Sequence, residues 1–167
     1  MHKIKLILID VDGIMTDGTK IYNEDHEVIY KKFCDLDFTA IRRLMASDVN
    51  VCLVSGDLFN KKMADKRNIP FIYSRAKQDE IPEIQKKYNV GYNNMAFVGD
   101  DMFDYEIMMC CNHRFCPKNS PNDLQKICTK IIDRHSGDGV IARLYDMLVL
   151  MKLINPAEIK NIGSWHS

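Results

Sequence analysis

The sequence predicts an α/β fold, a doubly wound (Rossmann-like) parallel sheet in a single domain. Short apolar runs alternate with amphipathic stretches, the pattern of strands joined by crossover helices. Runs such as Leu6-Ile7-Leu8-Ile9 show no polar alternation, which is typical of strands covered by helices on both faces. With 167 residues, 46% of them hydrophobic, the chain is long and apolar enough for one packed core.

Strands and helices are expected to follow one another along the chain. Strands are expected at Lys5–Ile9, Val51–Val54, Phe71–Tyr73, Ala96–Val98, Arg114–Cys116 and Lys130–Ile132. Helices are expected at Phe38–Ala46, Leu58–Arg67, Glu80–Tyr88, Phe103–Met109, Pro121–Cys128 and Asp138–Met151.

One segment breaks the alternation and predicts a β-hairpin flap at about residues 19–33. Two short apolar runs, Lys20-Ile21-Tyr22 and Val28-Ile29-Tyr30, flank a polar turn. The hairpin directly follows the first acidic strand end, so we expect it to stand over the site formed there. Residues 1–153 are expected to form the domain, without a separate cap domain. Residues 154–167 are expected to form a C-terminal tail, where Trp165 is the one sign of docking.

Composition and charge exclude several classes of partner. The 23 basic and 23 acidic residues give a net charge of zero, and there is no long basic run, so nucleic-acid binding is not expected. No apolar stretch has membrane-spanning length and no signal peptide is recognisable, which predicts a cytoplasmic protein without a membrane partner. The six cysteines show no C-x-x-C spacing and are expected to be reduced and structural.

Acidic residues cluster where two of the expected strands end. Asp10 and Asp12 follow the first strand, and Asp100, Asp101 and Asp104 follow the fourth. In open α/β sheets ligands bind beyond the carboxyl ends of the strands, so both clusters are expected in one site. Carboxylates gathered there repel one another unless a hard cation lies among them, and the sequence therefore predicts Mg2+ as cofactor.

Two further polar groups lie at element ends between these clusters. Ser55-Gly56 closes the second strand, and Lys77 precedes the third expected helix. A carboxylate nucleophile, a second carboxylate, a hydroxyl, a lysine and a metal site together supply what phosphoryl transfer requires. The substrate is therefore expected to be a small phosphorylated molecule.

These motifs resemble the four ordered motifs of the haloacid dehalogenase superfamily of phosphatases. They read Asp10-Val11-Asp12-Gly13-Ile14-Met15-Thr16-Asp17-Gly18, Ser55-Gly56, Lys77 and Gly99-Asp100-Asp101-x-x-Asp104. The short chain, the hairpin and the ending Ser136-Gly137-Asp138-Gly139-Val140 resemble one capless branch more closely. That branch comprises the 3-deoxy-D-manno-octulosonate 8-phosphate phosphatases and the nonulosonate 9-phosphate phosphatases, so the resemblance implies a sugar-acid phosphate as substrate.

The resemblance also implies a division of labour among the acidic residues. Asp10 is expected to attack phosphorus and form an aspartyl-phosphate, and Asp12 to act as general acid and then general base. Asp10, the backbone carbonyl of Asp12, and Asp100 are expected to bind Mg2+, with Asp101 and Asp104 in outer or orienting positions.

Other matched positions are implied to hold the phosphoryl group. Ser55, with Gly56, is expected to bond a phosphoryl oxygen, and Lys77 to pair with Asp10 and the phosphoryl charge. Gly13 is expected to let the backbone approach the phosphate closely. Thr16 is expected either to contact substrate or to cap the hairpin; both interpretations stay open.

The departures from the branch pattern concern substrate recognition. Leu36-Asp37-Phe38 stands where the octulosonate enzymes carry Arg-Asp-Gly, and Arg75 is a candidate substitute anion contact. Asp57 and Lys66 resemble an acid and a lysine of the nonulosonate enzymes, although a surface ion-pair pattern explains them equally well.

Three other expectations depend on the same motifs. The resemblance implies a homotetramer in which neighbouring subunits close the site. A receiver-type phospho-switch is an alternative of another class, but receivers place the acidic pair early and the lysine late. A non-catalytic phosphatase-like assembly module is a further alternative, against which the intact Asp10, Asp12, Lys77 and Asp100 argue.

Overall fold

The computed structural model describes residues 3–158, which form a six-stranded parallel sheet in the order β5-β4-β1-β6-β7-β8. The strands are β1 (Leu6–Ile9), β4 (Asn50–Ser55), β5 (Phe71–Tyr73), β6 (Met95–Val98), β7 (His113–Pro117) and β8 (Lys130–Ile132). Leu6 on the central β1 lies opposite Asn50 on one side and Met95 on the other. The predicted α/β fold is confirmed, and the observed strand ends lie within one residue of the expected ones.

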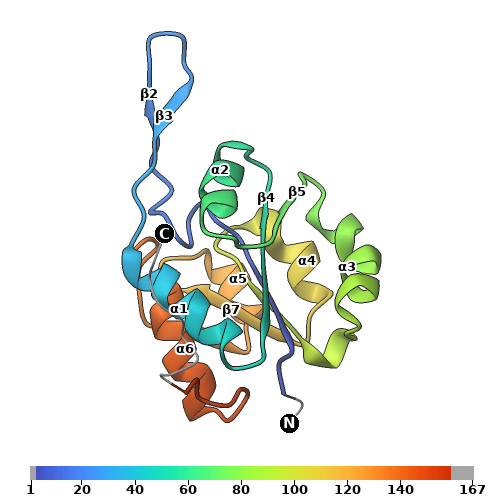
Figure 1. Cartoon of the computed structure of the whole chain (residues 1–167). Helices are drawn as coiled ribbons and strands as arrows, with labels where there is room; N and C mark the ends of the chain where they lie inside the picture. The colour runs from blue at the N-terminus through green and yellow to red at the C-terminus, as the bar shows by residue number, and fades with distance from the viewer. Residues whose placement is uncertain (1–2, 159–167) are drawn as a thin grey trace.

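Helices cover both faces of the sheet, because alternate residues of each strand point to opposite sides. Ile7 and Ile9 of β1 pack in one hydrophobic cluster with residues of α1 (Asp35–Met45), α2 (Phe59–Lys66) and α6 (Val140–Leu150). Leu6 and Leu8 pack in the other cluster with residues of α3 (Ile81–Tyr88), α4 (Tyr105–Met109) and α5 (Asn122–Ile127). Figure 1 shows α1 beside α6, with α3 and α4 on the other side of the sheet.

The strand order reverses beside β1, and this reversal positions the site. The chain runs outward from β1 through β4 to β5, then crosses to β6 on the other side of β1 and continues outward to β7 and β8. The carboxyl ends of β1 and β6 therefore flank the switch point, which is where open α/β sheets bind ligands. Asp10 comes directly after the end of β1, and Asp100 comes two residues after the end of β6.

The predicted hairpin is present as the antiparallel strands β2 (Ile21–Tyr22) and β3 (Val28–Tyr30). Its tip extends away from the sheet (Figure 1), so only its base lies at the site and the expectation that the hairpin covers the site holds only there. Its apolar side chains are not buried within the chain: Ile21 is 59% exposed and Tyr30 65%. Within residues 3–158 there is no separate cap domain.

Two helices begin with 3-10 turns that the sequence pattern did not distinguish. The turn η1 (Lys77–Glu80) leads into α3, and η3 (Met102–Asp104) leads into α4; a third turn, η2 (Tyr92–Asn94), precedes β6. All six cysteines have free thiols, and Cys52 is fully buried within β4. No helix in residues 3–158 is both long and apolar enough to cross a membrane. The expectation for Trp165 falls outside the described residues.

Candidate active site

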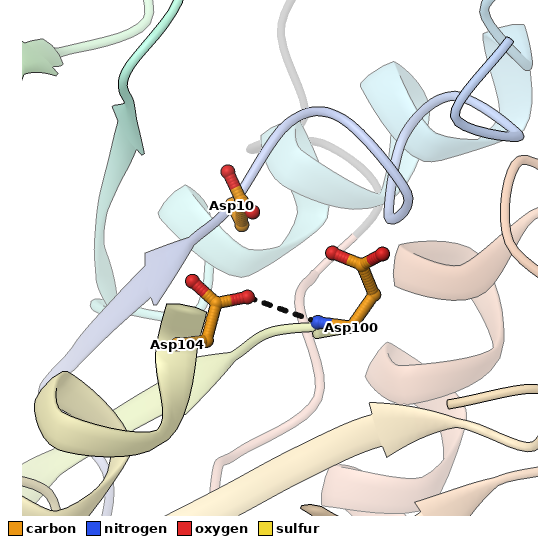
Figure 2. A group of neighbouring side chains, drawn as sticks. All are labelled: Asp10, Asp100 and Asp104. Carbon is orange, nitrogen blue, oxygen red and sulfur yellow. Dashed lines mark hydrogen bonds between the residues drawn. The ribbon is translucent and has the colours of Figure 1, made fainter. Parts of the chain in front are cut away.

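Three carboxylates from two neighbouring strand ends converge at the switch point. Asp10 follows β1, Asp100 follows β6, and Asp104 closes η3; one oxygen of each lies within 4.8 Å of the other two. Figure 2 shows their side chains turned toward one another. The predicted meeting of the first and last acidic motifs is therefore what the fold produces.

Lys77 lies between two of these carboxylates. Its Nζ is 3.0 Å from Oδ2 of Asp10 and 2.6 Å from Oδ1 of Asp104, and its side chain is nearly buried. The other oxygen of Asp104 accepts the backbone N–H of Asp100 at 3.0 Å (Figure 2). Both oxygens of Asp104 are thus engaged, which fits the orienting position that the sequence resemblance implied for it.

The site has more negative charge than its lysine can neutralise. Burial and the neighbouring Asp104 raise the pKa of Asp10 well above its usual range, although Lys77 opposes them. Burial, Asp104 and Asp101 raise the pKa of Asp100 to about 7. Burial lowers the pKa of Lys77, but the negative charges of Asp10 and Asp104 raise it by more, so the pKa lies above its usual value. A compact set of oxygen donors with excess negative charge fits a hard divalent cation such as Mg2+.

Asp12 has separate partners and does not belong to this carboxylate group. Its two oxygens accept hydrogen bonds from Nζ of Lys31 at 2.7 and 2.9 Å, and Oδ2 also accepts from Nδ2 of Asn60 at 3.0 Å. Lys31 comes from the base of the hairpin and Asn60 from α2. Sequence reasoning missed both residues. The available signal was the placement of Lys20 and Lys31, one at each end of the hairpin.

Ser55 and Asp57 extend this second group of polar side chains. Oγ of Ser55 accepts Nδ2 of Asn60 at 3.0 Å and the backbone N–H of Asp57 at 3.1 Å. Oδ2 of Asp57 contacts Nζ of Lys31 at 2.8 Å and Nζ of Lys20 at 2.9 Å. Burial raises the pKa of Asp57, but the hydrogen bonds from the two lysines outweigh it and hold the pKa well below the usual range.

Two glycines leave space that the carboxylates of Asp100 and Asp104 occupy. Gly13 has φ +81°, and a Cβ placed there would lie 1.9 Å from Oδ2 of Asp100. A Cβ on Gly99 would lie 2.5 Å from Oδ2 of Asp104. The close approach at Gly13 is to the carboxylate of Asp100, and the expected approach of its backbone to a phosphate stays a prediction.

Thr16 and Arg75 are two further residues that were expected at the site. The buried hydroxyl of Thr16 accepts the backbone N–H groups of Gly13 at 3.3 Å and of Gly18, just before the hairpin, at 3.2 Å, which favours the interpretation that Thr16 caps the hairpin. At Gly56 an added Cβ would lie 3.4 Å from Cγ of Arg75, which places the exposed Arg75 beside the Ser55-Gly56 turn.

Two residues do not join the site as expected. The carboxylate of Asp101 is exposed and accepts the backbone N–H of Met102 at 2.6 Å, capping η3 instead of joining the carboxylate group. Lys66 is exposed on α2 and lines a groove with other residues of α2 and with Ile29 of the hairpin. Asp101 thus lies outside the group of Asp10, Asp100 and Asp104 but close enough to raise the pKa of Asp100, and the expected roles of Asp101 and Lys66 stay predictions.

Asp37 is the one residue of the Arg-Asp-Gly element that this sequence keeps. It is fully buried in α1. Its Oδ1 accepts the backbone N–H groups of Ile141 at 2.8 Å and Ala142 at 3.0 Å, in the first turn of α6. Burial outweighs these bonds and raises its pKa to about 6. Asp37 therefore joins α1 to the N-terminus of α6.

Comparisons with known proteins agree with this geometry. Residues 71–144 match the family described as haloacid dehalogenase-like hydrolase. The chain is 27% identical over 153 residues to the 3-deoxy-D-manno-octulosonate 8-phosphate phosphatase of Haemophilus influenzae, covering 89% of this chain and 84% of that protein. It is 30% identical over 113 residues to the enzyme of the same name from Escherichia coli K12, covering 64% of this chain and 58% of that protein.

Solved structures show the same architecture. The cobalt-bound form of the deoxy-D-mannose-octulosonate 8-phosphate phosphatase from Haemophilus influenzae has a TM-score of 0.82 at 26% identity, covering 89% of this chain and 88% of that one. The Moraxella catarrhalis octulosonate phosphatase, in complex with magnesium, phosphate and KDO, has a TM-score of 0.80 at 22% identity, covering 88% of this chain and 86% of that one, and supports the fold. These comparisons favour neither the nonulosonate nor the receiver interpretation.

Proposed function

The chain belongs to the haloacid dehalogenase-like hydrolases and is a phosphatase, and from that premise we propose that its substrate is 3-deoxy-D-manno-octulosonate 8-phosphate. The observation that supports the chemistry is the convergence of Asp10, Asp100 and Asp104, of which Asp10 and Asp104 contact Lys77. The similarity to octulosonate 8-phosphate phosphatases over most of the chain supports the choice of substrate.

In the proposed reaction Asp10 is the nucleophile. Its carboxylate oxygen attacks phosphorus, the bond from phosphorus to the sugar oxygen breaks, and Asp12 gives its proton to that oxygen. Water then attacks the aspartyl-phosphate, Asp12 takes a proton from it, and the bond between phosphorus and Asp10 breaks. Inorganic phosphate leaves and both carboxyl groups return to their starting states.

The same residues are proposed to hold Mg2+. Asp10, Asp100 and the backbone carbonyl of Asp12 are the proposed ligands, and Asp104 orients Lys77 and the backbone at Asp100. When bound, Mg2+ supplies charge neutralisation for the phosphoryl group. Lys77 adds a second positive charge beside Asp10, and the hydroxyl of Ser55 is proposed to donate to a phosphoryl oxygen.

Substrate recognition is proposed to come from the rim and from neighbouring subunits. Asp57 directly follows the Ser55-Gly56 turn and Arg75 lies beside Gly56, and both are proposed to contact the sugar acid. A homotetramer is proposed because the hairpin exposes Ile21, Tyr22 and Tyr30, which a neighbouring subunit would cover.

The test is phosphate release from a panel of substrates in the presence of Mg2+. We expect hydrolysis of octulosonate 8-phosphate at a higher kcat/KM than that of nonulosonate 9-phosphates or simple sugar phosphates. Asp10→Asn serves as the control and is expected to lose at least about 10³-fold in kcat, because the covalent route is removed. Release from none of these substrates, or an active Asp10→Asn protein, contradicts the proposal.

A further inference from the structure

Lys31 is a buried cation to which the proposed reaction assigns no role. Its side chain is 0% exposed, although it lies beside a hairpin whose tip extends away from the domain. Its Nζ bonds both oxygens of Asp12, Oδ2 of Asp57 at 2.8 Å and Oδ1 of Asn60 at 2.9 Å. Burying an ammonium group is costly unless it is paired and hydrogen-bonded, and here it has a full set of acceptors.

These contacts involve Asp12, and none of them is with Asp10, Asp100 or Asp104. Lys77 is the ammonium that contacts Asp10 and Asp104, whereas Lys31 contacts Asp12. Asn60 bonds both Lys31 and Asp12, so the amide fixes the ammonium and the carboxylate relative to each other. The two ammonium groups therefore contact different carboxylates: Lys77 contacts Asp10 and Asp104, and Lys31 contacts Asp12 and Asp57.

We infer that Lys31 is a positioning residue for Asp12 and makes the base of the hairpin part of the catalytic site. This inference rests on the proposed function, in which Asp12 protonates the leaving oxygen. A general acid must lie within hydrogen-bond reach of the atom that receives its proton, and a small displacement is costly. Lys31 and Asn60 together hold the Asp12 carboxylate against rotation.

If Lys31 positions Asp12, its loss should slow the reaction by an amount that depends on the leaving group, which a purely structural role would not produce. Phenyl phosphate and p-nitrophenyl phosphate have similar shapes and no sugar, but p-nitrophenolate leaves without help from an acid. The ratio kcat/KM covers only binding and the steps up to phosphoryl transfer, so the later base step does not enter it. A misplaced Asp12 should therefore slow phenyl phosphate much more than p-nitrophenyl phosphate.

The experiment measures kcat/KM for both aryl phosphates with the full-length chain and Mg2+. In Lys31→Met we expect the value for phenyl phosphate to fall by roughly 10²-fold, within the range that general acid catalysis contributes, while that for p-nitrophenyl phosphate changes little. Lys31→Arg should keep part of the activity, because a guanidinium also donates two hydrogen bonds to a carboxylate. Lys32→Met, at the exposed neighbouring residue, should keep the wild-type ratio.

The ratio of the two rates is independent of partial unfolding, and a second variant tests whether Lys31 acts through Asp12. The ratio of the two substrates is measured on one preparation, so an inactive fraction cancels. In an Asp12→Asn background, adding Lys31→Met should leave the ratio unchanged, because both changes act on the same step. An unchanged ratio of the two kcat/KM values in Lys31→Met, whether or not both values fall, would overturn the inference. Additive effects of Lys31→Met and Asp12→Asn on that ratio would also overturn it. Wild-type activity on octulosonate 8-phosphate is scored separately, so a wrong substrate does not affect this test.

Discussion

At the scale of single residues, Gly13 leaves the space that the carboxylate of Asp100 occupies. Gly13 and Gly18 both have positive φ, +81° and +83°, but they differ in what surrounds them. A Cβ at Gly13 would meet the carboxylate of Asp100, whereas nothing lies within 4 Å of a Cβ at Gly18. The two positions therefore separate the cost of the backbone conformation from the cost of displacing Asp100.

We expect Gly13→Ala to lose Mg2+-dependent activity and Gly18→Ala to keep it. Each change should lower the free energy of unfolding by about 1–3 kcal/mol, because a side chain is strained at positive φ. The additional displacement of Asp100 in Gly13→Ala should weaken Mg2+ binding. Phosphate release as a function of Mg2+ concentration and urea unfolding measure the two effects. Equal Mg2+ dependence in both variants would contradict the assigned role of Gly13.

The pKa of Asp100 predicts how pH and Mg2+ act together on stability. Its carboxyl has a pKa of about 7 in the folded protein. The ordinary value in an unfolded chain is about 3.9. Between these values the folded state binds more protons than the unfolded state, so the stability of the metal-free protein falls as pH rises toward 7. Mg2+ competes with these protons and should stabilise more at pH values above 7 than below.

Thermal melting with and without Mg2+ measures this coupling. The increase in melting temperature on adding Mg2+ should be larger at a pH above 7 than at a pH well below it. Asp100→Asn, which removes the titrating group, should show a smaller increase and a flatter pH dependence. An increase that is the same at all pH values would show that protons and Mg2+ do not share this carboxylate.

At the scale of elements, Asp37 links α1 to α6 through the backbone N–H groups of Ile141 and Ala142. Asp37→Ala leaves these two donors unpaired in a buried position. We expect the free energy of unfolding to fall by roughly 1–3 kcal/mol, as for other buried donors that lose their acceptor. Asp37→Asn keeps an oxygen at this position and is the matched control, with a smaller loss. Urea unfolding distinguishes the two.

If Asp37→Ala is as stable as wild type but has a raised KM, its role is in the substrate pocket and the capping interpretation is wrong. A loss of stability with unchanged KM supports capping. The two quantities are measured on the same preparations, so each outcome decides between the roles.

Elements with a strong local pattern were predictable from sequence. β1 and β6 are unbroken apolar runs, and their ends correctly placed Asp10 and Asp100 in one site. The 3-10 turns before α3 and α4 were not predictable, because their i to i+3 hydrogen bonds leave no distinct hydrophobic period over so few residues. The strand ends could be predicted because burial on both faces excludes polar residues from the strand.

Contacts between distant segments were not predictable in the same way. Lys31 lies 19 residues after Asp12, and its contact depends on the path of the hairpin base, which no local pattern encodes. Asp101 and Asp104 are both acids of one motif, yet one caps η3 and the other bonds Lys77. Only the start of η3 decides which of them faces the site.

At the scale of the whole molecule, the base of the hairpin contacts the domain, whereas apolar side chains of β2 and β3 stay exposed within residues 3–158. Figure 1 shows β2 and β3 extending from the end of the molecule opposite to the end where α6 terminates. Ile21 and Tyr30 are 59% and 65% exposed there, together with Tyr22 and Ile29 at 44% and 42%, so four large apolar side chains are exposed on this one short element. Exposed apolar side chains grouped on one projecting element are typical of an interaction site.

We expect the protein to be a homotetramer in solution and the double variant Ile21→Lys/Tyr30→Lys to form smaller species, since two lysines placed opposite each other across the hairpin cannot pair with one another. Charged side chains on the hairpin would have to be buried in the interface, which is unfavourable without partners. Size-exclusion chromatography with light scattering gives the mass directly. Leu150→Lys changes a side chain that is 75% exposed on α6 and is expected to leave the assembly intact. If the hairpin completes a neighbouring site, kcat/KM for octulosonate 8-phosphate should fall with the mass in the double variant and not in Leu150→Lys. A monomeric wild-type protein with full activity would contradict this assembly.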